Sequence, residues 1–267
     1  MLQLAFLIAG LLKDVPRIPC PGCHLSVYDY EEINLEFCLM QRKLILTSDG
    51  SHTISLPGLN ATYHSIHGAI QESRHVFIDA GFKTLVPATT GRLRIFEVGF
   101  GTGLNALLTI IEAEKLRREV YYETIEQFPL DSKEMRLMNF CKQLGREDLQ
   151  PLFAQLHDCE WEKEIKVEPY FFFKKSKVNL LTLETSGTSE TFGSFQLIYF
   201  DAFAPNTQPE LWTKEIFEKM FAMLDPGGVL VTYCSKGDVR RTMQVAGFVV
   251  EKLPGPPGKR EIIRAHR

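Results

Sequence analysis

A turn that contains three glycines lies between a predicted strand and a predicted helix. Leu93–Val98 is an apolar run typical of a buried strand, and Leu104–Leu116 is rich in alanine, leucine and isoleucine, as buried helices are. The turn between them holds Gly99, Gly101 and Gly103. Glycines at such a place let the backbone bend sharply and let a ligand approach the peptide groups closely. The pattern therefore predicts a small-molecule site where the strand ends.

Two acidic residues near this turn indicate the kind of ligand. The Gly-x-Gly-x-Gly spacing differs from that of dinucleotide binders, and no Gly-Lys-Ser/Thr is present to hold a triphosphate. Glu97 would repel an anion but suits a cation, such as the sulfonium and amino groups of S-adenosylmethionine. Glu126 follows the predicted strand Val120–Ile125, where a carboxylate can accept hydrogen bonds from ribose hydroxyls. The alternative is an ordinary strand–turn–helix with a surface carboxylate at Glu126.

A third acidic residue, Asp201, follows the predicted strand 196–200. Ligands of open parallel sheets bind outside the carboxyl ends of the strands, so Asp201 is expected to face the same cleft as the glycine turn. A carboxylate that accepts the protons of an amine can aim its nitrogen lone pair at a methyl donor. Phe203 is expected to form a wall of this pocket. The alternative is that Asp201 only caps the following turn.

Strands and helices alternate from residue 40 onward, which predicts an α/β fold with a parallel, doubly wound sheet. Residues 248–253 and 260–265 flank a Pro-Gly-Pro-Pro-Gly turn and predict a C-terminal antiparallel hairpin. The other expected elements are a hairpin at 43–56, a loop leading into a helix at 62–77, a largely helical stretch at 133–164, strands at 170–174, 178–181 and 229–233, and helices at 213–224 and 237–246.

The first 39 residues differ from the rest of the chain. An apolar run at 2–12 is about half of the roughly 20 residues that a membrane-spanning helix needs, and no lysine or arginine precedes it as in a signal peptide. Cys20, Cys23 and His24 formally match a covalent haem attachment motif, but such short motifs recur by chance. We expect neither haem nor metal here, and we interpret 1–39 as an atypical extension with Met40 as a plausible start.

The distribution of charge favours a nucleic-acid partner more than the total does. The 267 residues carry 30 basic and 33 acidic side chains, which excludes a strongly cationic nucleic-acid binder but not a local basic face. Residues 1–39 hold two basic and five acidic side chains, the whole imbalance, whereas 236–267 hold eight basic and three acidic ones. This basic end is expected to contact an RNA backbone, or else to be an ordinary solvated surface. The candidate RNA contacts are Arg240, Arg241, Lys259 and Arg260.

These features together resemble one known family, the methyltransferase that completes 5-methylaminomethyl-2-thiouridine in bacterial tRNA, either alone or as the amino-terminal half of a bifunctional enzyme. The resemblance covers nearly all of residues 40–265. The matching segments are 60–78, 96–105, 126–129 (Glu-Gln-Phe-Pro), 201–213 (Asp-Ala-Phe-Ala-Pro-Asn-Thr-Gln-Pro-Glu-Leu-Trp-Thr) and nearly everything from 224 to 265, including Pro-Gly-Pro-Pro-Gly-Lys-Arg-Glu.

The resemblance implies a Rossmann-like, seven-stranded methyltransferase sheet with helices on both faces and S-adenosyl-L-methionine as the cofactor. It implies N-methylation of the 5-aminomethyl group of the wobble uridine in the tRNA anticodon stem-loop. Asp201 would be the catalytic residue. The family's Gly-Asp near the adenine is replaced by Val178-Asn179, whose amide can still accept a hydrogen bond. The implied cofactor-binding residues are Glu97, Gly99, Gly101, Gly103, Glu126 and Asn179, together with Tyr63 and Glu72 in a segment that closes over the cofactor.

The resemblance also implies an organisation and a dependence. Residues 40–92 would form the hairpin and closing segment, and residues 93–267 the methyltransferase domain. The chain has no flavin oxidoreductase half, so a separate enzyme is expected to make the aminomethyl precursor, in the cytoplasm and away from membranes. The alternatives are a small-molecule amine methyl- or aminopropyltransferase on the same fold, and a degenerate cofactor-binding module.

Overall fold

An eight-stranded sheet organises the part of the chain that the computed structural model describes, which comprises residues 42–86, 91–183 and 194–267 within the compact unit Cys38–Arg267. Residues 1–39, with their cysteine motif, lie outside the described residues, so the interpretation of this segment stays a prediction. The strands of the large sheet are β4 (Leu93–Val98), β5 (Val120–Ile125), β6 (Ile165–Glu168), β7 (Phe171–Ser176), β8 (Phe195–Phe200), β9 (Leu224–Thr232), β10 (Val249–Pro254) and β11 (Glu261–His266).

The strand order is β10-β11-β9-β8-β4-β5-β7-β6, and the five strands from β9 to β7 are parallel. The order runs outward from β4 in both directions, so the sheet has its topological switch point where the glycine turn follows β4. The predicted α/β fold class is confirmed, as is the C-terminal hairpin, in which β10 and β11 pair antiparallel.

Three local predictions differ from the structure. The sheet has eight strands rather than seven because β6, a four-residue strand of alternating apolar and charged residues, adds antiparallel to the edge of β7. The strand predicted at 178–181 is wrong: Leu180–Thr182 is a short 3₁₀ helix, η4, which the side chain of Asn179 caps by accepting from the Leu181 N–H at 2.9 Å. Strand β9 begins at Leu224, earlier than expected, and bulges through Asp-Pro-Gly-Gly before it pairs regularly.

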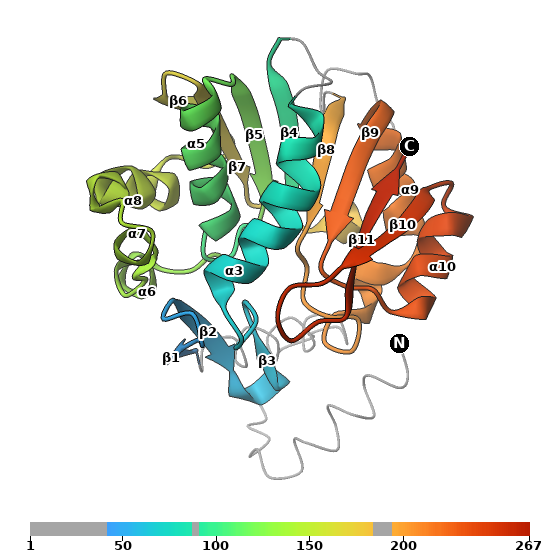
Figure 1. Cartoon of the computed structure of the whole chain (residues 1–267), viewed down its shortest axis with the longest axis horizontal. Coiled ribbons are helices and arrows are strands. Elements are labelled where there is room, and N and C mark those ends of the chain that lie inside the picture. Colours follow the sequence, from blue (N-terminus) through green and yellow to red (C-terminus); the bar gives the residue numbers. More distant parts are fainter. Residues whose placement is uncertain (1–41, 87–90, 184–193) are drawn as a thin grey trace, which may run out of the picture. The chain divides into compact units, whose positions relative to one another are not determined.

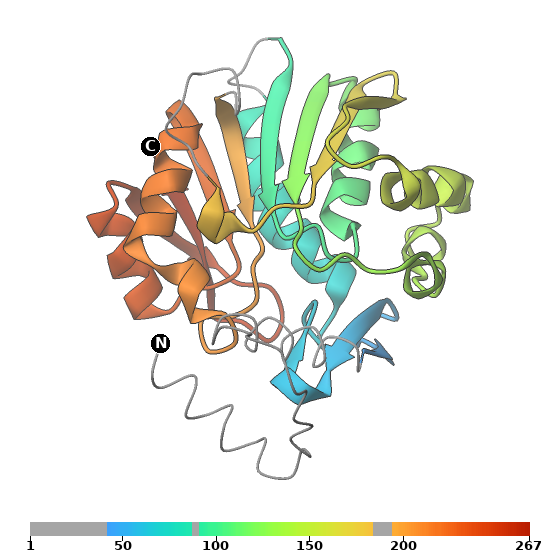
Figure 2. The same ribbon diagram turned by 180° about the vertical axis from the view of Figure 1, so that it is seen from behind.

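Helices cover both faces of the large sheet (Figures 1 and 2). One face carries α5 (Leu104–Leu116) and a continuous helix made of α3 (Ala69–Ser73), the π-helical η2 (Arg74–Phe82) and α4 (Lys83–Leu85). The other face carries α9 (Lys214–Met223) and α10 (Gly237–Val245). The remaining helices are α6 (Ser132–Arg136), α7 (Phe140–Gln143), α8 (Gln150–Asp158) and the 3₁₀ turns η1 (Pro57–Leu59), η3 (Glu147–Leu149) and η5 (Pro209–Trp212).

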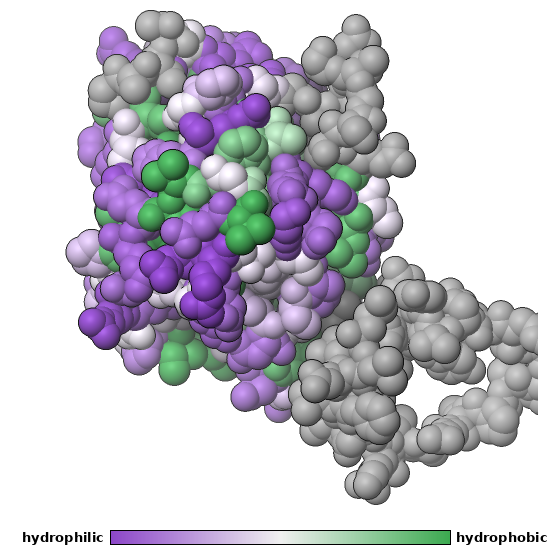
Figure 3. All heavy atoms as spheres, turned by 90° about the vertical axis from the view of Figure 1, so that its right-hand side faces the viewer, coloured by the Kyte–Doolittle hydropathy of each residue, from purple (hydrophilic) through white to green (hydrophobic). Residues whose placement is uncertain are grey.

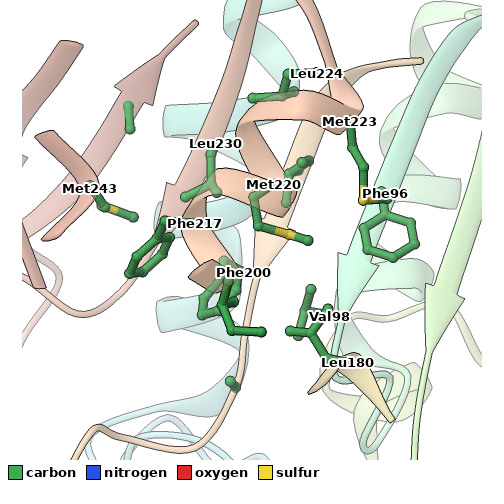
Figure 4. Close-up of a cluster of buried hydrophobic side chains, with 14 of the residues drawn as sticks. Phe96, Val98, Leu180, Phe200, Phe217, Met220, Met223, Leu224, Leu230 and Met243 are labelled. Atoms are coloured by element: carbon green, nitrogen blue, oxygen red, sulfur yellow. The ribbon is translucent and has the colours of Figure 1, made fainter. Parts of the chain in front are cut away.

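The apolar spacing of α9 explains the core on its face of the sheet. Phe217 and Met220 are fully buried against Phe200 and Leu230 of the sheet (Figure 4), and burial of each such side chain contributes about 1.5–3 kcal/mol. Thr213 caps the helix, as predicted, by accepting from the Ile216 N–H at 3.4 Å. These contacts fix the ends of β8 and β9 and therefore the segment that begins at Asp201.

A small antiparallel sheet stands beyond the edge at which the parallel strands end (Figures 1 and 2). It consists of β1 (Lys43–Leu46), β2 (His52–Leu56) and β3 (Ala61–Thr62), so the predicted hairpin is confirmed. Asn139 secures it, donating to the Gly50 carbonyl at 2.9 Å and accepting from the His52 N–H at 2.8 Å. Among the residues that the structure describes, none of the helices has the length and apolar character needed to cross a membrane.

Candidate active site

The glycine turn adopts a conformation that side chains would strain. Gly99, Gly101 and Gly103 have φ of 89°, 49° and 74°, in the region that favours glycine. A Cβ atom on Gly99 would lie 2.7 Å from the backbone oxygen of Asp201. The N–H groups of Gly99 and Phe100 donate to the carbonyl at the end of β5, at 3.1 and 3.3 Å. The turn is therefore packed directly against the segment that carries Asp201.

Glu126, at the end of β5, closes the turn from the other side. Its Oε2 accepts from the Gly101 N–H and its Oε1 from the Phe128 N–H, both at 2.9 Å. A carboxylate has about four lone-pair directions, so both oxygens can still accept from further donors. The side chain is half-buried. This arrangement can receive the hydroxyls of a ribose, as predicted for Glu126.

Glu97 is a carboxyl without exposed surface beneath the turn. Thr124 Oγ1 donates to its Oε2 at 2.8 Å, and Asn105 Nδ2 donates to its Oε1 at 3.0 Å. Burial raises the pKa of Glu97 to about 8, although both hydrogen bonds favour the charged form. A cation bound above Glu97 would stabilise its charged form further, in addition to the two hydrogen bonds.

Asp201 lies on the opposite side of the same amide. Asn105 Nδ2 also donates to Asp201 Oδ2, at 2.8 Å. Burial, together with the charge of nearby Glu72, raises the pKa of Asp201 to about 7, although Asn105 and Lys259 act in the opposite direction. A carboxyl whose pKa is close to neutrality can exchange a proton with a bound group under physiological conditions.

Two aromatic side chains lie beside the turn. A Cβ atom on Gly101 would come within 3.2 Å of the Tyr63 ring, so Tyr63 contacts the middle of the glycine turn. Its ring packs edge-on against Phe203, with centroids 5.2 Å apart and planes at 80°. Burial, with the charge of Glu126, raises the pKa of the Tyr63 hydroxyl, which therefore stays neutral. The structure thus brings Tyr63, Phe203 and the turn together.

Glu72 and Lys259 form an ion pair near Asp201. Glu72, on α3, is 7% exposed and accepts from the Ser65 N–H at 2.8 Å. Lys259, in the turn between β10 and β11, has its ammonium 3.8 Å from the centre of the Tyr233 ring. Lys259 is therefore turned toward the site, away from the free surface position expected for an RNA contact.

The other three candidate RNA contacts lie outside this cluster. Arg241 pairs with Asp238 on α10. No ion pair of Arg240 or Arg260 is found among the described residues, and Arg260 is exposed. Figure 3 shows the side of the molecule that carries α10 and the C-terminal hairpin, which is largely hydrophilic.

The basic C-terminal end is partly neutralised by its own neighbours. Lys252 pairs with Glu261 and Arg264 with Glu251, in addition to the pairs made by Arg241 and Lys259. The guanidinium of Arg267 donates to carbonyls at the end of α9. Four of the eight basic side chains are therefore paired with carboxylates, so fewer unpaired basic side chains remain than the count of basic residues suggests.

Asn179 follows β7, the neighbour of β5, at the same edge of the sheet. Its side-chain oxygen accepts from the Leu181 N–H, and its contact with an adenine stays a prediction.

Sequence reasoning missed Asn105 as a separate functional side chain. It is the second residue of α5, and its amide lies between the two buried carboxyls. It also missed His64, a fully buried ring whose Nε2 lies 2.7 Å from Thr102 Oγ1 in the glycine turn. Burial lowers the pKa of His64 to about 4, so the ring is neutral. The position of Asn105, two residues after the last glycine, was the available signal.

Comparison with known proteins agrees with this geometry. The family model for S-adenosyl-L-methionine-dependent methyltransferases matches residues 152–267. The chain is 31% identical over 214 residues to the tRNA 5-methylaminomethyl-2-thiouridine biosynthesis bifunctional protein MnmC of Nitrosospira multiformis, which covers 76% of this chain and 33% of that protein. It is 31% identical over 228 residues to the protein of the same name from Cupriavidus metallidurans, covering 82% and 33%.

The crystal structure of MnmC2 from Aquifex aeolicus has the same fold, with a TM-score of 0.68 at 21% identity over 98% of this chain and 82% of that one. Fold and site define the class: the chain belongs to the S-adenosyl-L-methionine-dependent methyltransferases. Within that class, the chain is similar to the MnmC proteins in sequence and to MnmC2 in fold. The chain spans about a third of the length of the curated relatives, at 33%.

The residues present fit this cofactor. The positive φ angles of the turn leave its peptide groups accessible to close approach. Glu126 has acceptor capacity for ribose hydroxyls, and the buried carboxyl of Glu97 suits a cationic group. These acceptor groups therefore match a ligand that is cationic at one end and carries a ribose.

Proposed function

We propose that the chain transfers a methyl group to the 5-aminomethyl nitrogen of wobble 5-aminomethyl-2-thiouridine in tRNA, giving 5-methylaminomethyl-2-thiouridine. The observation that carries the proposal is a half-buried carboxyl, Asp201, beside the glycine turn with a pKa near neutrality. The relatives at 31% identity are named for the biosynthesis of this nucleoside. A separate enzyme supplies the aminomethyl precursor, and the reaction takes place in the cytoplasm.

Asp201 performs the proton chemistry in this proposal. S-adenosyl-L-methionine, when bound, supplies an electrophilic methyl group on a positively charged sulfur. A primary alkylammonium is protonated at neutral pH and has no free lone pair. The Asp201 carboxylate accepts a hydrogen bond from that ammonium and takes one of its protons, which frees the lone pair for attack. With its pKa near 7, Asp201 is ionised often enough to act and basic enough to accept.

The side chains around Asp201 prepare the site. Tyr63 and Phe203 provide an aromatic wall that excludes water and offers a surface for a flipped base. Glu126 binds the ribose of the cofactor, and Asn179 contacts its adenine. Residues 40–92 supply the closing segment with Tyr63 and Glu72, and residues 93–267 form the methyltransferase domain.

The tRNA is held by the basic end of the chain. Arg240, Arg241 and Arg260 contact phosphates of the anticodon stem-loop, because backbone contacts of this kind provide most of the affinity. A wobble base lies in a loop, so it can be extruded at less cost than a base inside a duplex.

Nucleoside analysis of tRNA from a deletion strain tests the proposal. The strain is expected to accumulate 5-aminomethyl-2-thiouridine and to lose its methylated form, and the wild-type gene should restore it. An unchanged nucleoside profile would refute the proposal. A small-molecule amine methyltransferase on the same fold would leave the tRNA profile unaltered.

A further inference from the structure

One side-chain amide connects the buried carboxyl of Glu97 with the half-buried carboxyl of Asp201. Asn105 is 3% exposed, and its Nδ2 lies 3.0 Å from Glu97 Oε1 and 2.8 Å from Asp201 Oδ2. An amide nitrogen carries two hydrogens, so each carboxyl receives one. Glu97 comes from β4 and Asp201 from the end of β8, and Asn105 stands where α5 begins between them.

The orientation of this amide follows from its neighbours. The NH₂ group of Asn105 faces both carboxyls, which accept its hydrogens through Glu97 Oε1 and Asp201 Oδ2. Its Oδ1 is consequently turned away, and among the residues that the structure describes it has no hydrogen-bond partner, although it is buried. An unpaired buried oxygen is destabilising, which indicates that Asn105 serves the two carboxyls rather than the stability of α5.

We propose that Asn105 is a positioning residue that couples the cofactor-binding carboxyl of Glu97 to the catalytic carboxyl of Asp201. This inference rests on the proposed function for the role of Asp201. Asn105 occupies Oδ2 of Asp201, and no hydrogen bond of Oδ1 is found in the described part of the chain. Oδ1 is therefore the oxygen that faces the substrate ammonium and accepts its proton.

The same amide favours the ionised form of both carboxyls. Its hydrogen bonds lower the pKa of Glu97 and of Asp201 against the effect of burial. Without it, the pKa of both carboxyls would be higher, and Asp201 would retain its proton at neutral pH and lose its capacity as a base. The other titratable groups that act on Asp201 or respond to its charge are Glu72, Lys259, Tyr122 and Tyr233. Within the described part of the chain, none of these four side chains is hydrogen-bonded to both carboxyls.

The test compares two substitutions at this position. Asn105→Ala removes both donors, and Asn105→Asp keeps the shape but replaces the NH₂ group with an oxygen. We expect the acidic limb of the kcat–pH profile to move upward by about one pH unit in both variants, so that turnover at pH 7 falls about fivefold or more. The alanine variant should also stay about tenfold or more below wild type at high pH, because the orientation of Asp201 is lost.

Two control variants separate this role from a structural one. Thr124→Val removes a donor to Glu97 alone and should leave the acidic limb of kcat without an upward shift. Thr109→Val removes a donor to the Asn105 backbone carbonyl and contacts neither carboxyl, so its profile should match wild type. If both Asn105 variants lower the thermal unfolding temperature but keep the wild-type pH profile, the proposal is wrong. If the alanine variant does not fold, the kcat–pH profile of the aspartate variant alone decides the test.

A binding measurement distinguishes failure of this inference from failure of the proposed function. Calorimetry with S-adenosyl-L-methionine needs no tRNA, and affinity should rise with pH as Glu97 loses its proton. That rise is expected at higher pH in both Asn105 variants than in wild type. A wild-type chain that binds this cofactor but methylates no tRNA contradicts the function; an unshifted pH dependence of binding contradicts the role of Asn105.

Discussion

At the scale of single residues, the site depends on carboxyls kept in an environment that disfavours their charge. Glu97 and Asp201 have pKa values raised by burial to about 8 and about 7, and both receive hydrogen bonds that oppose this shift. Ionised carboxyls in such a site destabilise the folded chain until a cation binds beside them. A cationic cofactor and an ammonium substrate are ligands that relieve this cost.

Asp201→Asn tests the proposed base directly. The amide keeps the size of the side chain but cannot accept the proton of an ammonium, so turnover on tRNA should fall by about 10²–10⁴-fold. Calorimetry should show nearly unchanged affinity for S-adenosyl-L-methionine. The matched control is Asp238→Asn on exposed α10, which should retain turnover within about twofold; substantial activity in Asp201→Asn would contradict its role.

Glu97→Gln tests the buried charge through stability. Because the pKa of Glu97 is raised from 4.5 to about 8, the folded chain holds a proton that the unfolded chain has released between these values. The free energy of unfolding should therefore fall as pH rises through this range, by at most about 1.4 kcal/mol per unit from this group. Urea denaturation should show a flatter pH dependence for Glu97→Gln; equal slopes in both proteins would argue against a raised pKa.

At the scale of elements, the glycine turn joins the ends of three neighbouring strands. It follows β4, hydrogen bonds to the end of β5 and packs against the residue after β8. Any displacement of this turn therefore moves Asp201 as well as the cofactor-binding groups.

Gly99→Ala should show this coupling. The new Cβ would meet the backbone oxygen of Asp201 at 2.7 Å in addition to the strained φ of 89°. Gly145→Ala is the matched control, since Gly145 has φ of 64° but nothing within 4 Å of its Cβ. We expect the control to lose about 1 kcal/mol of stability and Gly99→Ala to lose a further ~1–3 kcal/mol together with cofactor affinity. Equal losses in urea denaturation would contradict the close packing.

Elements with strong local signals could be predicted from the sequence. The bounds of β4, α5 and β5 follow from three apolar runs, the first two separated by the glycine turn and the last two by the charged residues 117–119, and the glycine turn locates the cleft. Strand β6 could not be found, because four residues with charges at alternate positions are stabilised by pairing with β7 rather than by their own pattern. Local apolar residues at 178–181 suggested a strand, whereas the capping by Asn179 begins a helical turn there.

The other features that the sequence did not predict depend on contacts between distant segments. The sequence indicated a free basic residue at Lys259, because its partner, Glu72, lies 187 positions earlier. The joint contact of Asn105 with Glu97 and Asp201 likewise requires the sheet to be assembled first. Charge counts along the chain show neither effect, so they overestimate the basic surface.

At the scale of the whole molecule, the charges that can meet RNA are those without a buried acidic partner. No ion pair of Arg240 or Arg260 is found among the described residues, and Arg241 pairs only with the exposed Asp238 on its own helix. Reversal of Arg240, Arg241 and Arg260 to glutamate should raise the KM for tRNA about tenfold or more and leave the affinity for S-adenosyl-L-methionine unchanged. The control reverses Lys115 and Arg117, which lie at the far end of α5, about 20 Å along the helix from the glycine turn. Equal effects of the two sets on KM would contradict a basic face near the site.

The most direct test of the account is methyl transfer by the purified chain. It is incubated with S-adenosyl-L-methionine carrying a labelled methyl group and with tRNA that bears 5-aminomethyl-2-thiouridine, and the digested nucleosides are analysed by mass spectrometry. We expect one labelled methyl group on the aminomethyl nitrogen of the wobble uridine, and no labelled product with tRNA that lacks the aminomethyl group. A chain that binds the cofactor yet leaves this nucleoside unlabelled would contradict the account.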